Sequence, residues 1–234
     1  MENQKSNFFF LTLFIVGILS GILLIFISTW GDLEAAFYGF DRTGGQRLSS
    51  LSCPIVMSKN ESSSFSIKVR NSTDRKIAPS VKTDISSSFA PITTYESIAL
   101  EPGETKKMEW SIGAENIDLK RFILVRTWVY AAYPLPDRES TCGVMVLDLP
   151  FSGRIATWGI TLLSLLGMGI GLYGQRQIEG EDGRGVKGSR FAFIAMLVAI
   201  GIINSFFGIW LIGVLVIAIT LLTIVISIVH SFRW

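Results

Sequence analysis

The chain has 234 residues, of which 49% are hydrophobic and only 17% are charged. Its mean hydropathy of +0.47 is too high for an ordinary water-soluble globule, although its formal net charge is only +2. Lys, Arg, Asp and Glu are absent from residues 8–30, 155–175 and 191–232. We therefore expect an integral membrane protein, for which the lipid bilayer is the first partner.

Four transmembrane helices are predicted. An apolar run of about twenty residues matches the roughly 30 Å hydrocarbon thickness of a bilayer, because a helix rises about 1.5 Å per residue. The last apolar run is about twice as long as one span needs, so we expect a helical hairpin with its turn at residues 204–208. The expected spans are residues 8–27, 155–173, 191–203 and 209–229.

The orientation follows from the positions of basic residues beside the spans. Lys5, the loop 174–190 and Arg233 carry the excess of Lys and Arg, which is typical of the cytoplasmic side. Arg154 is a mild exception on the other side. Both termini are therefore predicted to be cytoplasmic, with residues 31–153 extracytoplasmic, residues 174–190 a flexible cytoplasmic loop and residues 191–234 a helical hairpin with a short tail.

Residues 1–30 are interpreted as a cytoplasmic N-terminus and an uncleaved signal anchor. The alternative is a cleaved signal peptide. Two features of residues 1–30 favour the uncleaved anchor. The apolar core of this segment is longer than the 7 to 15 residues usual in a signal peptide, and the exit sequence STWGD lacks a small-x-small cleavage pattern.

Residues 31–153 have the pattern of a β domain. Phe65, Ile67 and Val69 alternate with polar residues, and the same period of two recurs around Trp110. Further strands are expected at residues 80–85, 95–100, 122–130 and 144–148, separated by segments rich in turn-forming residues. Six or seven short strands without an intervening helical pattern predict an all-β sandwich between the first and second spans.

The two cysteines, Cys53 and Cys142, both lie in this segment. In an oxidising compartment they are expected to form a disulfide, and the alternative is a pair of free thiols. No C-x-x-C motif is present, which argues against a redox-active dithiol.

Two stretches of this segment resemble a known family. SFSIKVRNST and IALEPGETKKMEWSI are similar to the bacterial Ig-like domains of the CARDB and NEW3 type, in which a strand ends in Asn and a PGE turn leads into the next strand. The resemblance implies an Ig-like sandwich and no particular activity. The four-span plan, with Trp30 and Cys53, is similar to claudins in topology only, because Cys142 is far from Cys53.

The stretch GMGIGLYG contains a G-x-G-x-x-G pattern at Gly169, Gly171 and Gly174. A dinucleotide site would need a strand before this pattern and a helix after it, whereas here the glycines lie within an expected span. Small residues four positions apart instead favour close helix packing. The predicted packing glycines are Gly17, Gly21, Gly167 and Gly171.

Catalytic and metal sites are not expected. The only histidine, His230, lies near the end of the last span, far in sequence from the segment 31–153, so neither a Ser-His-Asp triad nor a zinc site is predicted. No ionisable residue lies within the expected spans, which argues against a transport pathway in this chain alone. The segment 31–153 carries 14 basic and 15 acidic residues, so nucleic-acid binding is not expected either. We predict a protein that is not an enzyme and that has no cofactor.

The predicted function is protein–protein contact by an accessory or scaffold subunit of a membrane complex. The alternatives are an adhesion or cell-envelope protein that binds glycan or a neighbouring surface, and a non-catalytic subunit of a membrane enzyme or transporter. Exposed aromatic and apolar residues are the candidate contacts, and the region around Phe37 is alternatively an interfacial anchor. The candidates are Phe37, Tyr38, Phe40, Tyr133 and Leu135, and the possible glycosylation sites are Asn60 and Asn71.

Overall fold

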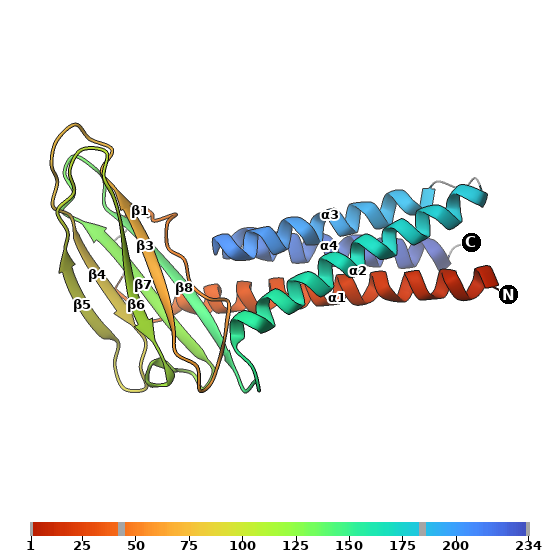
Figure 1. Ribbon diagram of the computed structural model, residues 1–234, viewed down its shortest axis with the longest axis horizontal. Coiled ribbons are helices and arrows are strands. Elements are labelled where there is room, and N and C mark those ends of the chain that lie inside the picture. The colour runs from red at the N-terminus through yellow and green to blue at the C-terminus, as the bar shows by residue number, and fades with distance from the viewer. Residues whose placement is uncertain (1, 42–44, 183–185, 233–234) are drawn as a thin grey trace. The chain divides into compact units, whose positions relative to one another are not determined.

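The computed structural model describes residues 2–41, 45–182 and 186–232. The chain divides into two compact units (Figure 1). Residues 1–29 and 155–234 form a helical unit, and Trp30–Arg154 form a β domain inserted between its first and second helices. The described residues thus form four α-helices and a β-sheet domain.

The four helices are α1 (Glu2–Phe37), α2 (Gly153–Asp182), α3 (Val186–Phe207) and α4 (Trp210–Phe232). The end of α1 from Trp30 and the first two residues of α2 belong to the β domain, and the rest forms the helical unit. Two stretches, Phe8–Phe37 and Gly153–Gln177, are long and apolar enough to cross a membrane. Two shorter apolar stretches, Phe191–Phe207 and Trp210–Ile226, form α3 and α4 around a turn at Gly208, whose φ of 61° suits glycine. The side chain of Asn204 stabilises this turn by donating a hydrogen bond of 3.0 Å to the carbonyl oxygen of Ile209.

Glycines allow close approach of helices within the helical unit. A Cβ atom on Gly17 of α1 would lie 2.6 Å from the backbone nitrogen of Met168 and 2.9 Å from the carbonyl carbon of Gly167 on α2. A Cβ atom on Gly171 would meet the backbone of Phe14 in the same way, and one on Gly21 would meet Ser164 and side chains of α3. The packing at these positions therefore requires glycine, which has a hydrogen atom in place of a side chain.

Two helix boundaries differ from the sequence-based expectation. α1 continues to Phe37, because the residues DLEAAF that follow the apolar run are mostly good helix formers. α2 continues through QRQIEGED to Asp182, although the segment from residue 174 was expected to be a flexible connector. Gln, Arg and Glu extend a helix at little cost, so the composition that suggested a loop also suits a solvated helix end.

The described residues of the β domain form two sheets. The six-stranded sheet has the order β1-β8-β7-β4-β5, with β2 also paired to β8, and the two-stranded sheet consists of β3 and β6. The pairs β4·β5, β4·β7, β7·β8 and β3·β6 are antiparallel, whereas β1 and β2 run parallel to β8. The strands are β1 (Gln46–Arg47), β2 (Val56–Ser58), β3 (Ser63–Arg70), β4 (Ser80–Ile85), β5 (Ile92–Ser97), β6 (Thr105–Ile112), β7 (Phe122–Tyr130) and β8 (Arg138–Leu147).

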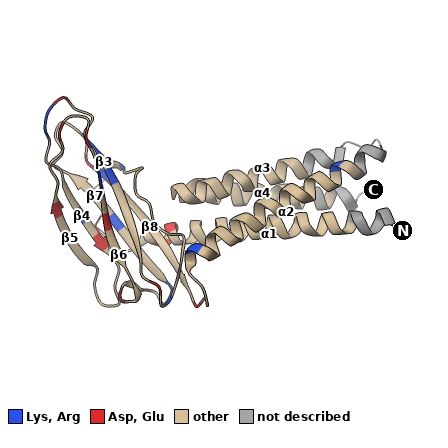
Figure 2. Cartoon of the chain, in the orientation of Figure 1, with Lys and Arg blue, Asp and Glu red and all other residues tan. Residues whose placement is uncertain are grey.

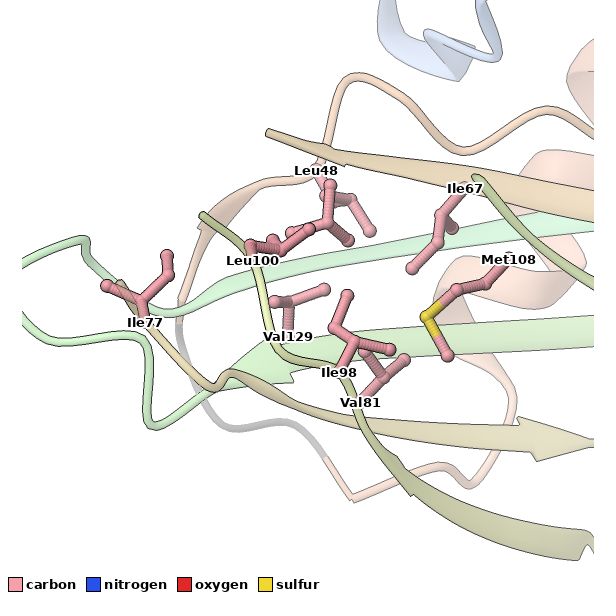
Figure 3. Close-up of a cluster of buried hydrophobic side chains, with 9 residues drawn as sticks. Leu48, Ile67, Ile77, Val81, Ile98, Leu100, Met108 and Val129 are labelled. Carbon is pink, nitrogen blue, oxygen red and sulfur yellow. The ribbon is translucent and has the colours of Figure 1, made fainter. Parts of the chain in front are cut away.

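The hydrophobic core lies between the two sheets. Figure 3 shows one of its clusters, in which Ile67 and Met108 of β3 and β6 meet Val81 and Val129 of β4 and β7. A second cluster contains Phe65, which stacks on Trp110 with ring centroids 5.3 Å apart. Burial of these apolar side chains from both sheets is the main force that holds the sheets together.

Cys53 and Cys142 form a disulfide, as the sequence predicts, with Cα atoms 6.5 Å apart. The bond links the segment before β2 to β8 and closes a loop of 89 residues. In the chain-entropy model, closure of a loop this long stabilises a domain by roughly 4–5 kcal/mol. A disulfide is also typical of an extracytoplasmic domain.

Candidate functional site

The outer face of the six-stranded sheet is the face turned away from the two-stranded sheet. Successive side chains of a strand point to opposite faces, and Val81, Val125 and Val129 point into the core. Their neighbours Lys82, Arg126, Trp128 and Tyr130 therefore lie on the outer face, together with the residues in register with them on β5 and β8.

One part of the outer face is covered by the end of α1. Gly31 and Gly143 meet backbone to backbone, so that a Cβ atom on either would overlap the other residue. Gly143 lies on β8 between the segments paired with β1 and β2, and its N–H donates a hydrogen bond of 3.2 Å to the buried carboxylate of Asp32. Next to this contact, Phe40 and Ala35 pack against Phe122 and Leu124 of β7. Residues 30–40 are thus an integral part of the β domain.

A buried ion-pair network lies next to the covered part. Arg126 on β7 is fully buried, and its guanidinium donates hydrogen bonds of 2.7 Å to Glu139 on β8 and 2.9 Å to Asp84 on β4. Burial alone would lower the pKa of Arg126, but the hydrogen bonds and charges of Glu139 and Asp84 outweigh burial and raise the pKa. Lys82 adds a further ion pair of 3.5 Å with Asp84. The network keeps Arg126 charged and ties three central strands together.

The remaining part of the outer face carries a row of side chains that are in register across five strands, here called the cross-strand row. Its aromatic members are Trp128 and the exposed Tyr95, which retains 66% of its accessible surface. Trp128 also stacks on Tyr130, with ring centroids 4.2 Å apart. The row consists of Arg47, Glu139, Trp128, Lys82 and Tyr95.

The cross-strand row combines exposed and nearly buried side chains. Arg47 and Tyr95 are exposed, whereas the side chains of Lys82 and Glu139 retain only 16% and 12% of their accessible surface and are paired with Asp84 and Arg126. Among the described residues, the indole Nε1 of Trp128 is a buried donor with no hydrogen-bond partner. The described part of the chain also contains no group of His, Cys, Asp and Glu that could hold a metal ion.

The predicted contact residues fall into two separate groups. Phe37 is exposed at 74% and Tyr38 is half-buried, whereas Phe40 is buried at 8% in the cluster with Leu124 and is not available to a partner. Tyr133 is exposed at 81% and lies under the guanidinium of Arg75, 5.0 Å from its ring centroid. Leu135 packs against the core cluster of Val81 and Val129. The five residues therefore do not form one surface.

Tyr38 makes a specific contact in the loop between α1 and β1. Its hydroxyl donates a hydrogen bond of 2.5 Å to Asp118. Burial, the hydrogen bond and the negative charge of Asp118 together raise the pKa of Tyr38 to about 12. The residue therefore has a structural role in addition to any contact with a partner.

The two sequons differ in accessibility. Asn60 is exposed in the turn between β2 and β3. Asn71 is fully buried, and its side-chain amide donates to the carbonyl oxygens of Arg75, Leu100 and Glu101 while its oxygen accepts from Thr73. In the folded domain only Asn60 can carry a glycan.

Sequence reasoning identified neither the cross-strand row nor the ion-pair network of Arg126 beside it, and only the network left a signal in the sequence. Arg126 within the apolar stretch FILVRTWVY was the available signal, because an ionised residue in the middle of a buried strand needs buried partners. The partners Asp84 and Glu139 come from other strands, so only the sheet order reveals them. The side chain of His230 lies outside the described residues.

Comparisons with known proteins give no family. No family model matches the chain, and no curated protein matches it. Partial structural matches exist among glycosidases. A Bacteroides uniformis β-glucuronidase 2 matches 44% of this chain and 12% of its own at 14% identity and a TM-score of 0.30. A Paenibacillus cycloisomaltooligosaccharide glucanotransferase matches 48% and 15% at 12% identity and a TM-score of 0.34.

A third structure of this kind is the β-glucosidase from Listeria innocua, which matches 46% of this chain and 17% of its own at 17% identity and a TM-score of 0.29. The chain therefore spans less than a fifth of the length of each of these enzymes. The similarity covers only part of this chain and a small part of each enzyme. The enzymatic activities named here are those of the matched enzymes.

Proposed function

We propose that the protein is a non-enzymatic accessory or scaffold subunit of a membrane complex, whose β domain binds another protein through the cross-strand row. The observation that carries the proposal is the buried, unpaired Nε1 of Trp128 next to charged and aromatic neighbours. A buried donor without an acceptor costs about 1–3 kcal/mol. Because Nε1 is enclosed by its own chain, the indole must turn outward to reach an acceptor on the partner, and this new hydrogen bond would recover the cost.

We further propose that all four helices cross the membrane, with both termini in the cytoplasm, and that the β domain is an Ig-like sandwich outside. The segregation of charge supports this assignment. Figure 2 shows charged residues on the strands and loops of the β domain, whereas the apolar stretches 8–30 and 155–175 carry none. The disulfide between Cys53 and Cys142 supports an oxidising compartment for the same domain.

Purification from the native membrane in a mild detergent, followed by mass spectrometry, tests the proposed function. We expect other membrane proteins to co-purify in stoichiometric amounts. Trp128→Phe keeps an aromatic ring but removes the N–H, so it should reduce the recovered partner without lowering the stability of the β domain. Lys68→Ala, an exposed substitution on β3 in the two-stranded sheet, serves as the matched control.

Three outcomes contradict the proposal. A chain that purifies alone and binds glycan favours the adhesion alternative. Turnover of a substrate by the isolated chain shows an enzyme. Equal partner recovery with Trp128→Phe and with the wild-type chain places the contact elsewhere.

A further inference from the structure

Strand β5 is an open edge of the six-stranded sheet. It pairs with β4 on one side and ends the sheet order on the other. The N–H of Ile98 donates to Pro79, and the N–H of Ser86 donates to Leu124. Ile98 and Pro79 are therefore a hydrogen-bonded pair of this ladder. Because such pairs occur at every second residue of antiparallel strands, the even-numbered residues of β5 bond to β4. The backbone groups of Thr93, Tyr95 and Ser97 therefore point away from the sheet.

Two other strand edges of the β domain are protected. On the far side of β8, the strands β1 and β2 and the carboxylate of Asp32 occupy the backbone groups. The edge strand β6 carries Lys106, Lys107 and Glu109, and such charges discourage pairing with another chain. In contrast, β5 has the sequence ITTYES, with one charge and no proline, and is exposed along most of its length. An edge of this kind is a template for a further strand.

The sequence of β5 is complementary to itself in one antiparallel register. If Tyr95 lies opposite Tyr95 of a second copy, Thr93 lies opposite Ser97, and the outward backbone groups of all three residues are matched. The two tyrosines then form an aromatic cross-strand pair on the outer face. On the inner face, Glu96 lies opposite Thr94, and its carboxylate accepts a hydrogen bond of 2.7 Å from the indole of Trp110 in its own copy. No like charges face each other directly in this register.

We propose that two copies of the chain pair through β5 to form a continuous sheet across the dimer, with Tyr95 at the two-fold axis. The occupant is a second copy because the register matches hydroxyl with hydroxyl at Thr93 and Ser97 and ring with ring at Tyr95, and because it leaves the single carboxylate of β5 without a like charge opposite. The pairing goes beyond the proposed function, since it involves no other protein.

Disulfide trapping in native membranes tests the register. Directly opposed residues in a hydrogen-bonded pair have Cα atoms about 5.5 Å apart, within the range of about 4.4–6.8 Å that a disulfide spans. Tyr95→Cys should therefore give a covalent dimer on mild oxidation, at least about fivefold more than Lys106→Cys on the β6 edge. Equal yields from the two variants overturn the proposal. The native cysteines do not compete, because they are bonded to each other.

A charge exchange tests the interface without a covalent bond. Tyr95→Glu places a carboxylate opposite Lys82 in its own copy but places two carboxylates opposite each other at the two-fold axis. We expect the dissociation constant of the purified full-length chain in detergent to rise at least about tenfold, and a mixture with Tyr95→Lys to restore the dimer. Lys106→Glu should leave the dimer unchanged.

Each remaining outcome overturns the pairing. These outcomes are a wild-type chain that is monomeric at membrane concentrations, a dimer that survives Tyr95→Glu, and a β5 edge that binds only a strand of another protein. If Tyr95→Glu lowers the melting temperature, loss of the dimer could follow from unfolding. In that case disulfide trapping with Tyr95→Cys decides whether two copies pair through β5. A monomeric chain that still recovers its partner through Trp128 would separate failure of this inference from failure of the proposed function.

Discussion

Arg126 is a buried cation whose charge is balanced by carboxylates from two neighbouring strands. Loss of the cation would leave the carboxylates of Asp84 and Glu139 without the guanidinium that they share, in a site with little exposed surface. Removal of one partner from a buried ion-pair network costs about 3–5 kcal/mol, because the remaining charge stays desolvated. The main effect of Arg126 is therefore to offset the desolvation cost of the two buried carboxylates.

We predict that Arg126→Met lowers the free energy of unfolding of the β domain by about 3–5 kcal/mol. The measurement is urea unfolding of the full-length chain in detergent, followed by tryptophan fluorescence. Arg121→Met, at the exposed residue just before β7, should change the same free energy by no more than about 0.5 kcal/mol. Similar unfolding curves for the two variants would show that the network is not buried.

The hydrogen bond from Tyr38 to Asp118 predicts a pH-dependent stability. The folded-state pKa of Tyr38 is about 12, above the ordinary value of 10.0, so the folded state holds the hydroxyl proton more tightly than the unfolded state. The stabilisation is complete below pH 10 and is lost as pH rises toward 12. Tyr38→Phe should destabilise the domain by about 1 kcal/mol at pH 8 and by much less at pH 11.5.

Urea unfolding at the two pH values checks the prediction for Tyr38. Tyr133→Phe is the control, because Tyr133 is exposed and its substitution should give the same small difference at both pH values. A difference between Tyr38→Phe and wild type that stays constant from pH 8 to pH 11.5 would contradict the assignment.

After β3, the side chain of Asn71 forms hydrogen bonds with backbone groups of the neighbouring segments. Its side chain donates to three carbonyl oxygens and accepts from the N–H and hydroxyl of Thr73. We predict that Asn71→Ala lowers the melting temperature by at least about 4 °C, because it leaves several buried groups unpaired. Asn60→Ala should have no measurable effect. Differential scanning fluorimetry measures both, and equal melting temperatures would refute the role of Asn71.

At the scale of elements, alternation predicted the strands with a polar and an apolar face. The predicted and observed bounds of the fourth and seventh strands coincide at residues 80–85 and 122–130. β5 was placed at residues 95–100 but spans Ile92–Ser97. The apolar Ile98 and Leu100 suggested a strand, but they follow it and fill the core.

β8 shows why long-range partners limit a prediction from sequence. Only residues 144–148 were expected, whereas the strand begins at Arg138. Its first residues are polar because Glu139 faces Arg126 rather than solvent, and the sequence alone does not show that pairing. The candidate site was missed for the same reason, since Glu139, Trp128 and Tyr95 come from three strands. The short strands β1 and β2 carry too few residues for a periodic signal.

The contact between α1 and β8 depends on glycine at both positions. Gly143→Ala would place a methyl group in the backbone of Gly31 and push the helix end away from the sheet. Overpacking of this kind costs about 1–3 kcal/mol, so we expect the melting temperature of the β domain to fall by at least about 4 °C. Gly39→Ala is the matched control, since no atom lies within 4 Å of a Cβ at that position. Equal melting temperatures for the two variants would mean that the helix end does not rest on β8.

At the scale of the whole molecule, the two units differ in the solvent that their sequences suit. The β domain carries nearly balanced charge, a disulfide and a core between two sheets, so it is built for water and an oxidising compartment. The helices expose many large apolar side chains, including Leu162, Leu166 and Leu222, which only lipid or other apolar helices can cover without cost. The proposed function, recognition by a domain anchored in a membrane, requires this division.

The proposed topology predicts opposite accessibility for two exposed positions. Asp74→Cys, on the β domain, should react with a membrane-impermeant maleimide on intact cells, because residues 31–153 are proposed to lie outside. Arg176→Cys, on α2 beyond the apolar stretch, should react only after the membrane is permeabilised. The native cysteines are bonded to each other, so each variant has a single reactive thiol. Labelling of Arg176→Cys but not Asp74→Cys on intact cells would reverse the orientation, and it would also place the disulfide in a reducing compartment, where such bonds are rare.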